Sequence, residues 1–370
     1  MPKEKVLPWF LQKILIPGNE IADRPGYIVT KVSDAKTTIY LREICFFEDI
    51  LVDLEKAISK KYGKKGRLAL YKAGKEFGYV YSELSSFERY SAGNQKEFEQ
   101  FFKLFMDYIR ALWFSDYTYK IDCEKKIFTA EFQKHLVCSK NGLGSVLTEG
   151  CYAGFWAYLM GDLGIEGKQT KCQGRGDKKC AVIFGPNKLV GADNVPIDAG
   201  QLMISREYNA INAIRPTKHT RSSFIGMLKN KLFKYDNGVA LYNKNRIFFI
   251  GSNFIYHLER ELEKIDPKNS VLFDVCFNVG KRSAAPNDEM LIPEIFSLCG
   301  WGEPIIIKDE KGKRVVLNEI YPWFKTKFEH KFVIYRGLLS GMISRCFGKD
   351  IKLKTYSSLI SDSYIVTVRE

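Results

Sequence analysis

Two cysteines, Cys172 and Cys180, stand eight positions apart in the segment KCQGRGDKKCAVIF, residues 171–184. The Gly-Arg-Gly-Asp sequence between them is typical of a tight turn, so the segment predicts a β-hairpin. Both thiols are equally far from the centre of that turn, which would place them opposite each other on one face. Paired thiols of this kind can bind a metal, form a redox couple, or pack as small apolar side chains.

The sequence contains few other residues that favour conventional catalysis. It has four histidines, and no two of them have the spacing of a metal-binding helix. It lacks a Gly-x-Gly-x-x-Gly turn between a strand and a helix, a Gly-x4-Gly-Lys phosphate loop and a Gly-x-Ser-x-Gly elbow. No segment predicts a site for a hydride carrier. We therefore expect a protein that is not an enzyme.

The nine cysteines are scattered and stand mostly in apolar contexts, such as FDVCFNVG. No apolar run reaches the roughly 18 residues that span a bilayer, and the first apolar segment, VLPWFLQKILIPG, has no cleavage site typical of a signal peptide. A cytoplasmic protein with buried free thiols fits this pattern better than a disulfide framework does.

The net charge is the strongest compositional signal. The 370 residues include 57 Lys and Arg against 43 Asp and Glu, which gives a formal charge of +14. A basic excess of this size favours an anionic partner: RNA or a ribonucleoprotein, an acidic protein such as a polymerase subunit, or an anionic membrane surface. The alternative is a lysine-rich surface that serves only solubility.

Self-comparison indicates an internal duplication. Three glycines recur at one constant shift, namely Gly150, Gly154 and Gly161 opposite Gly337, Gly341 and Gly348. Further along, Tyr356 and Tyr364 stand opposite Cys172 and Cys180, so only the first copy keeps the thiols. We expect a first domain at 1–187, a linker at 188–203 rich in Gly, Pro and Asp, and a second domain at 204–370.

Hydrophobic periodicity predicts the same order of elements in both copies. Alternating apolar residues predict strand pairs, and apolar residues at three- and four-residue spacing predict helices. The strand pairs lie at 26–41, 117–132, 237–250 and 304–320, and the helices at 46–63, 67–78, 95–114, 148–162, 254–265 and 335–350. The predicted class is α+β, with an antiparallel sheet packed on helices in each copy and a glycine-bearing helix and a hairpin closing it.

The glycine helix, the Cys-x7-Cys hairpin with GRGD at its tip, and CGWGEPIIIKDEKG in the second copy resemble the 4-vinyl reductase domain family. The fold of that family is related to the small subunits of the TRAPP vesicle-tethering complex. Its members include sensory domains of aromatic-responsive transcriptional activators. The resemblance implies a tandem pair of 4-vinyl reductase-like domains with a ligand pocket between the helices and the sheet, closed by the glycine helix.

The resemblance also implies a zinc site in the first copy. Zinc-binding members use the two hairpin cysteines, a glutamate just before them and a cysteine before the glycine helix. Cys172 and Cys180 match the pair, whereas the other two positions fall on Gln169 and near Val146. Cys151 is our third candidate ligand, and Cys138, His135 and Glu166 are further alternatives.

The pocket implied by the resemblance would have aromatic walls, which suit an apolar or aromatic small molecule or a lipid tail. The residues expected there are Tyr71, Phe77, Phe102, Phe105, Trp113, Tyr152, Phe155 and Trp156. The alternative is a filled core, because aromatic residues at helical spacing usually pack inside. The sequence thus favours a non-enzymatic sensor or regulatory protein, and the alternative is a basic adaptor whose two copies pair within one chain.

Overall fold

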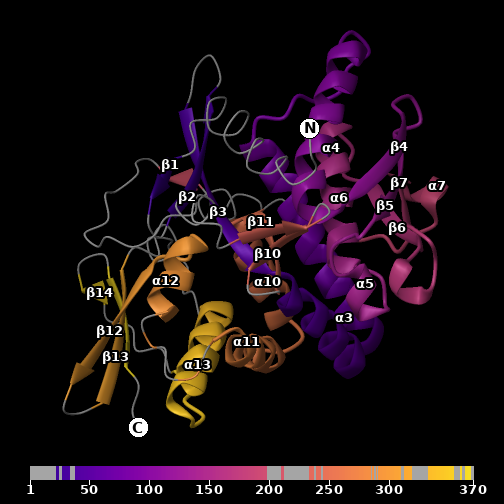
Figure 1. The fold of residues 1–370 in the computed structure, drawn as a ribbon. Coiled ribbons are helices and arrows are strands. Elements are labelled where there is room, and N and C mark those ends of the chain that lie inside the picture. Colours follow the sequence, from indigo (N-terminus) through magenta and orange to yellow (C-terminus); the bar gives the residue numbers. More distant parts are fainter. Residues whose placement is uncertain are drawn as a thin grey trace.

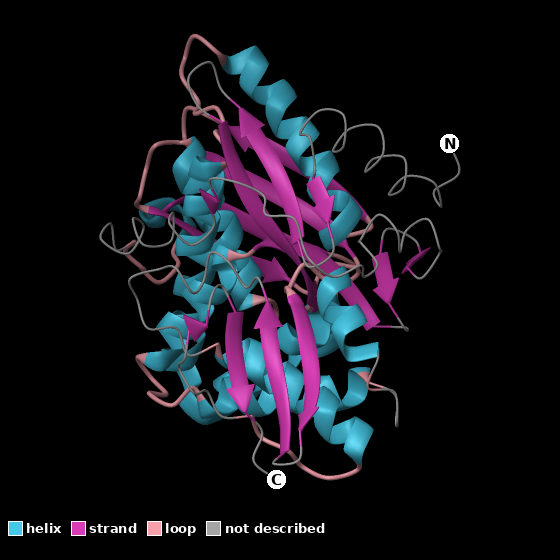
Figure 2. Ribbon diagram, turned by 90° about the vertical axis from the view of Figure 1, so that its left-hand side faces the viewer, coloured by secondary structure: helices cyan, strands magenta, loops and turns pink. Residues whose placement is uncertain are grey.

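The computed structural model describes residues 22–24, 27–33, 38–197, 210–211, 233–236, 239–242, 245–284, 286, 289, 291–309, 312–318, 332–353, 359–360 and 363–367. Figure 1 shows most first-half elements, indigo to magenta, on the right and most second-half elements, orange to yellow, on the left, but the first-half strands at 22–24 and 27–33 also lie on the left. In Figure 2 the strands run through the middle of the molecule, with helices on both sides of them. The described chain is α+β, as the sequence predicts.

The strands of the described residues form three antiparallel sheets. In the first half they are β1 (Ala22–Arg24), β2 (Tyr27–Ser33), β3 (Thr38–Phe47), β4 (Asp116–Asp122), β5 (Ile127–Gln133), β6 (Ile165–Lys171) and β7 (Cys180–Pro186). Beyond them are β8 (Ala210–Ile211), β9 (Phe233–Asp236), β10 (Val239–Tyr242), β11 (Asn245–Gly251), β12 (Glu303–Asp309), β13 (Gly312–Asn318), β14 (Leu359–Ile360) and β15 (Ser363–Thr367). The sheet orders are β1-β2-β3-β11-β10-β9, with β8 beside β3, then β4-β5-β7-β6, and β12-β13-β15-β14.

The helices confirm most of the predicted ranges. They are α3 (Glu48–Leu84), α4 (Gln95–Trp113), α5 (Cys138–Asn141), α6 (Val146–Leu159), the 3-10 turn η3 (Gln173–Arg175), α7 (Asn187–Val190), α10 (Asn253–Glu263), α11 (Ser270–Ser283), α12 (Leu291–Leu298) and α13 (Val333–Phe347). The helices expected at 46–63 and 67–78 are joined into α3, which bends at Gly63, where φ is 56°. Glycine adopts this positive φ without the steric cost that a side chain would add.

The same arrangement occurs in both halves of the described chain. The sheets β4-β5-β7-β6 and β12-β13-β15-β14 have the same strand order. In each of them the first strand along the chain lies at one edge, followed by the second, the fourth and the third. In each half the glycine helix packs along another long helix, α6 on α3 and α13 on α11. The duplication matches Tyr356 and Tyr364 of the second half with the two hairpin cysteines. Tyr356 lies outside the described residues, and only the backbone of Tyr364 is described.

The glycines of α6 and α13 lie where these helices touch their partners. A Cβ at Gly154 would lie 1.8 Å from the Lys75 carbonyl oxygen, and one at Gly341 would lie 1.9 Å from that of Phe277. A Cβ at Gly150 of α6 would likewise overlap the Tyr71 carbonyl oxygen. On the partner helices, a Cβ at Gly78 would overlap that of Cys151, and one at Gly280 would overlap that of Leu338. The recurrent glycines therefore allow backbone-to-backbone packing of two helices, rather than opening a groove for a ligand.

The two halves are joined through strands β3 and β11, which lie side by side between them (Figure 1). The antiparallel register pairs Cys45 with Phe249. The Trp113 indole N–H donates to the Phe249 carbonyl at 3.4 Å, and the Trp301 indole N–H donates to the Cys45 carbonyl at 2.7 Å. Phe46 of β3 packs on Trp301 with ring centroids 5.7 Å apart. Each half thus inserts a tryptophan beside the strand of the other, in a reciprocal contact like that of a two-fold dimer.

Buried arginines repeat this reciprocal pattern. Arg42 on β3 donates to the Gly300 carbonyl at 2.9 Å, and Arg246 on β11 donates to the Lys134 carbonyl at 2.9 Å. Arg246 also forms an ion pair with Glu48 at 3.2 Å. Within the described part of the chain, no helix has the length and apolar character needed to cross a bilayer.

The substitution Gly154→Ala should destabilise the protein, because its methyl group would overlap the Lys75 carbonyl. We expect a loss of about 3 kcal/mol in the free energy of unfolding, the upper range for overpacking in a core. Urea unfolding followed by circular dichroism measures this loss. Gly93→Ala is the matched control, since a Cβ there meets nothing within 4 Å, and it should change stability by less than about 0.5 kcal/mol. Equal stability of the two variants would contradict the proposed role of the glycine contact.

Candidate functional site

A cluster of sulfur and imidazole groups lies at the end of the first-half sheet. One ligand atom each from His135, Cys138 and Cys180 lies within 4.8 Å of the other two, and all three residues are buried. His135 follows β5, Cys138 begins the short helix α5, and Cys180 begins β7, the strand that pairs with β5. The His135 Nδ1 atom is 3.1 Å from the Cys138 sulfur.

The hairpin tip brings a further cysteine, Cys172, to the edge of the cluster, beside Cys138. Its sulfur lies 3.8 Å from the Cys138 carbonyl oxygen and also interacts with the Cys138 sulfur. This contact requires Gly174, because a Cβ there would lie 2.0 Å from the Cys138 carbonyl oxygen. The turn before α5 is formed by Val137, with φ at 69°, an uncommon conformation for a β-branched residue. The GRGD sequence therefore lets the hairpin lie directly on α5.

The electrostatics of the cluster favour metal-binding protonation states. Burial lowers the pKa of His135 to about 3, so its imidazole is neutral and keeps a free lone pair. The hydrogen bond from Cys138, together with the backbone N–H groups of Gly174 and Arg175, holds the pKa of Cys172 well below its ordinary value. The same thiol–thiol hydrogen bond raises the pKa of Cys138. One thiolate is thus already favoured before any cation binds.

Three thiols and one imidazole are a ligand set typical of structural zinc. The second nitrogen of His135 is 3.5 Å from the Tyr152 hydroxyl, a contact that would orient the ring as outer partners of metal-bound histidines do. The Gln169 side-chain amide donates to the Cys138 sulfur at 3.2 Å. The donor set therefore fits a zinc ion, with Gln169 as a hydrogen-bonding neighbour.

The cluster differs in part from the ligand set expected from sequence. Cys180 lies in it and Cys172 borders it at Cys138, whereas Cys151 does not lie in it, because it faces α3 at Gly78 and borders a separate cavity. The resemblance places a cysteine ligand before the glycine helix, near Val146, and in the structure Cys138 takes that role. Glu166 also lies elsewhere, in a buried ion pair with Lys75 at 2.7 Å. The left-handed turn at Val137 brings Cys138 back to the hairpin, and nothing in the sequence pattern indicates that turn.

An apolar cavity of about 60 Å³ lies between α3, α4, α6 and β11. Five of the eight predicted aromatic residues line it, namely Phe77, Phe105, Trp113, Tyr152 and Phe155. The other three do not: Tyr71 bonds to Glu166 at 2.8 Å, and Phe102 and Trp156 are fully buried against Phe128. The predicted aromatic wall is therefore partly cavity and partly filled core.

Two features of the cavity were missed by sequence reasoning. The Tyr81 hydroxyl donates to Glu43 at 2.8 Å, which puts one polar pair in the apolar wall. Burial raises the pKa of Glu43 to about 8, so this carboxyl is protonated and uncharged at neutral pH. Tyr81 follows Phe77 by one helical turn and could have been found by periodicity. The remaining wall, Phe249 to Gly251 on β11, comes from the other half of the chain.

Comparisons with known proteins leave the chain without an assigned family. No protein-family model matches the sequence, and no curated protein matches it. Among solved structures, it is similar to the phenol-responsive sensory domain of the transcription activator PoxR, crystallised with phenol. That match has a TM-score of 0.29 and 15% sequence identity, and covers 43% of this chain and 85% of the other. At this TM-score the similarity does not by itself indicate a shared function.

The zinc content of cysteine variants should show which thiols are zinc ligands and which are not. We expect the full chain to retain one equivalent of Zn²⁺ after dialysis, as measured by elemental mass spectrometry. Cys138→Ser and Cys180→Ser should each lose most of it, since a hydroxyl is a poor zinc ligand. Cys151→Ser, a substitution of the same size outside the cluster, should keep it. A wild-type protein without zinc, or zinc loss only in Cys151→Ser, would contradict this assignment.

The free energy of unfolding should depend on pH in a way that shows whether the buried Glu43 carboxyl is neutral. Because folding raises the pKa of Glu43 from 4.5 to about 8, this residue stabilises the fold most below pH 4.5, and the contribution is lost as the pH rises through 8. Relative to Glu43→Gln, wild-type stability should therefore fall by up to about 4 kcal/mol between these limits. Urea unfolding of both proteins across this pH range measures the difference. A constant difference would show that Glu43 titrates normally.

Proposed function

We propose that this chain is a non-enzymatic regulatory protein that senses a small apolar or aromatic molecule. It would consist of two domains of the 4-vinyl reductase type, 1–187 and 204–370, joined by the linker 188–203, with the ligand bound in the first. The observation that carries this proposal is the apolar cavity, in which aromatic side chains surround one polar pair, Glu43 and Tyr81. Specific small-molecule sites commonly combine an apolar wall with a few placed polar groups.

The size and chemistry of the cavity favour a ligand with a single ring and one hydroxyl. An engineered apolar cavity of about 150 Å³ binds benzene, whereas this cavity measures about 60 Å³. Entry of a ring would therefore require a side chain to move. Phe105 is the best candidate, because it is only half-buried and stacks on Phe155 with ring centroids 4.0 Å apart. A ligand ring would take over that stacking contact, and its hydroxyl would bond to Glu43 or Tyr81.

The position of the cavity supports a sensing role. Its walls come from α3, α4 and α6 of the first half and from β11 of the second. Trp113 lines it and also donates the hydrogen bond to Phe249 across the junction. A ligand that displaced these side chains would act on the contact between the halves, and so favour one arrangement of them over another.

The metal would have a structural role in this proposal. With Cys172 as the fourth ligand beside His135, Cys138 and Cys180, a zinc ion would have a full set of protein ligands, and no position would remain for a substrate or a reactive water. The ion would tie the hairpin tip to α5 and to the end of β5. Through the contact between His135 and Tyr152, the zinc centre would also support one wall of the cavity.

A second candidate, a basic adaptor for RNA or another polyanion, is favoured by one surface feature. An open groove of about 530 Å³ lies between α3 and α11. Lys56, Lys60, Lys281 and Arg282 line it together with a single acidic residue, Asp53. Contacts of such a groove would be mainly to phosphates and hence strongly dependent on salt.

Calorimetric titration of the full chain with phenol tests the sensor proposal. Wild-type protein should bind about one equivalent. Ile109→Phe, which adds a ring inside the cavity, should weaken binding about tenfold or more. Leu104→Phe is the matched control, on the same helix but with its side chain 67% exposed, and should bind as the wild type does.

Two results would overturn the sensor proposal. One is the absence of any phenol binding, and the other is equal binding by Ile109→Phe and the wild type. If nucleic acid also co-purified with the chain and dissociated at high salt, the adaptor would become the better supported function.

A further inference from the structure

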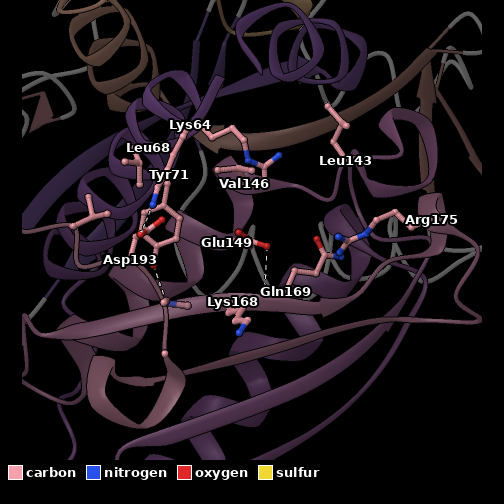
Figure 3. A pocket seen from close by; sticks show the side chains of 15 residues that line it. Lys64, Leu68, Tyr71, Leu143, Val146, Glu149, Lys168, Gln169, Arg175 and Asp193 are labelled. Carbon is pink, nitrogen blue, oxygen red and sulfur yellow. Dashed lines mark hydrogen bonds and ion pairs between the residues drawn. The ribbon is translucent and has the colours of Figure 1, made fainter. Parts of the chain in front are cut away.

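A polar cavity, larger than the aromatic one, lies beside the proposed metal centre. It measures about 390 Å³, within the range of small-molecule sites, and shares no lining residue with the aromatic cavity. Figure 3 shows it from close by, with Glu149 near its centre. Its lining residues come from α3, from the start of α6, from β6, from the hairpin tip and from the segment after α7.

Cationic side chains outnumber carboxylates in this cavity. The cations are Lys64, Arg67, Lys168 and Arg175, and the carboxylates are Glu149 and Asp193. Both carboxylates already have partners. Asp193 forms an ion pair with Lys64 at 2.8 Å, and Glu149 accepts a hydrogen bond from the Gln169 backbone N–H at 2.9 Å.

The two arginines have no such partners. Among the described residues, neither Arg67 nor Arg175 makes a hydrogen bond or an ion pair through its side chain. They come from separate elements, α3 and the hairpin tip, yet both lie close enough to Glu149 to lower its pKa, against the larger effect of burial. In Figure 3 Arg175 reaches toward the centre of the cavity beside Gln169. Two arginines therefore line one cavity beside the same carboxylate, and neither guanidinium group bonds to another described residue.

One wall of the cavity is rigid and partly apolar. The Tyr71 hydroxyl donates to the buried Glu166 at 2.8 Å and accepts the Gly167 N–H at 2.7 Å, so its ring is held in place. Leu68 and Val146 line the cavity beside it. A ligand here would find an apolar surface on one side and two cations on the other.

We propose that this cavity binds a small multivalent oxyanion, a molecule bearing phosphate or carboxylate groups, between Arg67 and Arg175. Guanidinium groups match both kinds of oxyanion in bidentate geometry, and two of the four cations that line the cavity are arginines. An anion with two negative charges would balance the excess of four cations over two carboxylates. This site is independent of the aromatic ligand proposed above.

The site would also be connected to the metal centre. Gln169 contacts Glu149 through its backbone N–H and the Cys138 sulfur through its side chain. Arg175 lies between Cys172 and Cys180 in the hairpin, and its backbone N–H donates to the Cys172 carbonyl at 2.9 Å. A bound oxyanion would therefore hold the hairpin tip that carries two of the proposed zinc ligands.

Calorimetric titration of the full chain with pyrophosphate and, separately, with citrate tests this proposal. At least one anion should bind with a stoichiometry of one, and the tighter of the two identifies phosphate or carboxylate as the recognised group. Arg67→Gln and Arg175→Gln should each weaken that binding about tenfold or more. Glu149→Gln should tighten it, because it removes a negative charge next to the anion. Saturating phenol should leave the affinity unchanged.

Lys178→Gln is the matched control, since it removes one positive charge from an exposed position on the same hairpin but does not line the cavity. It should bind the anion as the wild type does. Thermal unfolding of each variant checks that it is folded. The proposal would be overturned if neither anion bound at millimolar concentration, or if Lys178→Gln weakened binding as much as the arginine variants. Phenol binding in the same sample separates this failure from that of the sensor.

Discussion

The pairing of β3 with β11 is the interaction on which the rest of the structure depends. It places Cys45 opposite Phe249, and each of these residues accepts an indole hydrogen bond from a tryptophan of the opposite half. Because the contacts are reciprocal, neither half buries its edge strand without the other. The pairing also completes the aromatic cavity, since one of its walls is β11.

Backbone contact between helices sets the second constraint. At Gly154 the chain of α6 approaches the Lys75 carbonyl so closely that no side chain fits between them. This approach fixes α6 along α3 and hence fixes the directions of the α6 side chains that point elsewhere. The recurrence of the same contact at Gly341 and Phe277 shows that the second half uses the same device.

Helix α6 contacts all three candidate sites. Val146 and Glu149, in its first turn, line the polar cavity, and Tyr152 and Phe155 line the aromatic cavity. The Tyr152 hydroxyl lies 3.5 Å from the His135 ring of the candidate metal cluster. Because α6 is packed backbone to backbone on α3, the side chains that it contributes to the three sites hold fixed positions relative to one another.

Local pattern in the sequence determined the element types, the recurrence of the glycines and the hairpin that carries Cys172 and Cys180. These features follow from the alternation of apolar residues and from turn chemistry, which act over a few neighbouring positions. Only the tertiary structure decided which groups meet. Cys138 joins the thiols because the chain turns at Val137 and because Gly174 lets the hairpin tip lie on α5. The aromatic and polar cavities depend on segments far apart in sequence, such as β11 beside α4 and Arg67 and Arg175 on one cavity, and no local pattern encodes which distant segments will pack together.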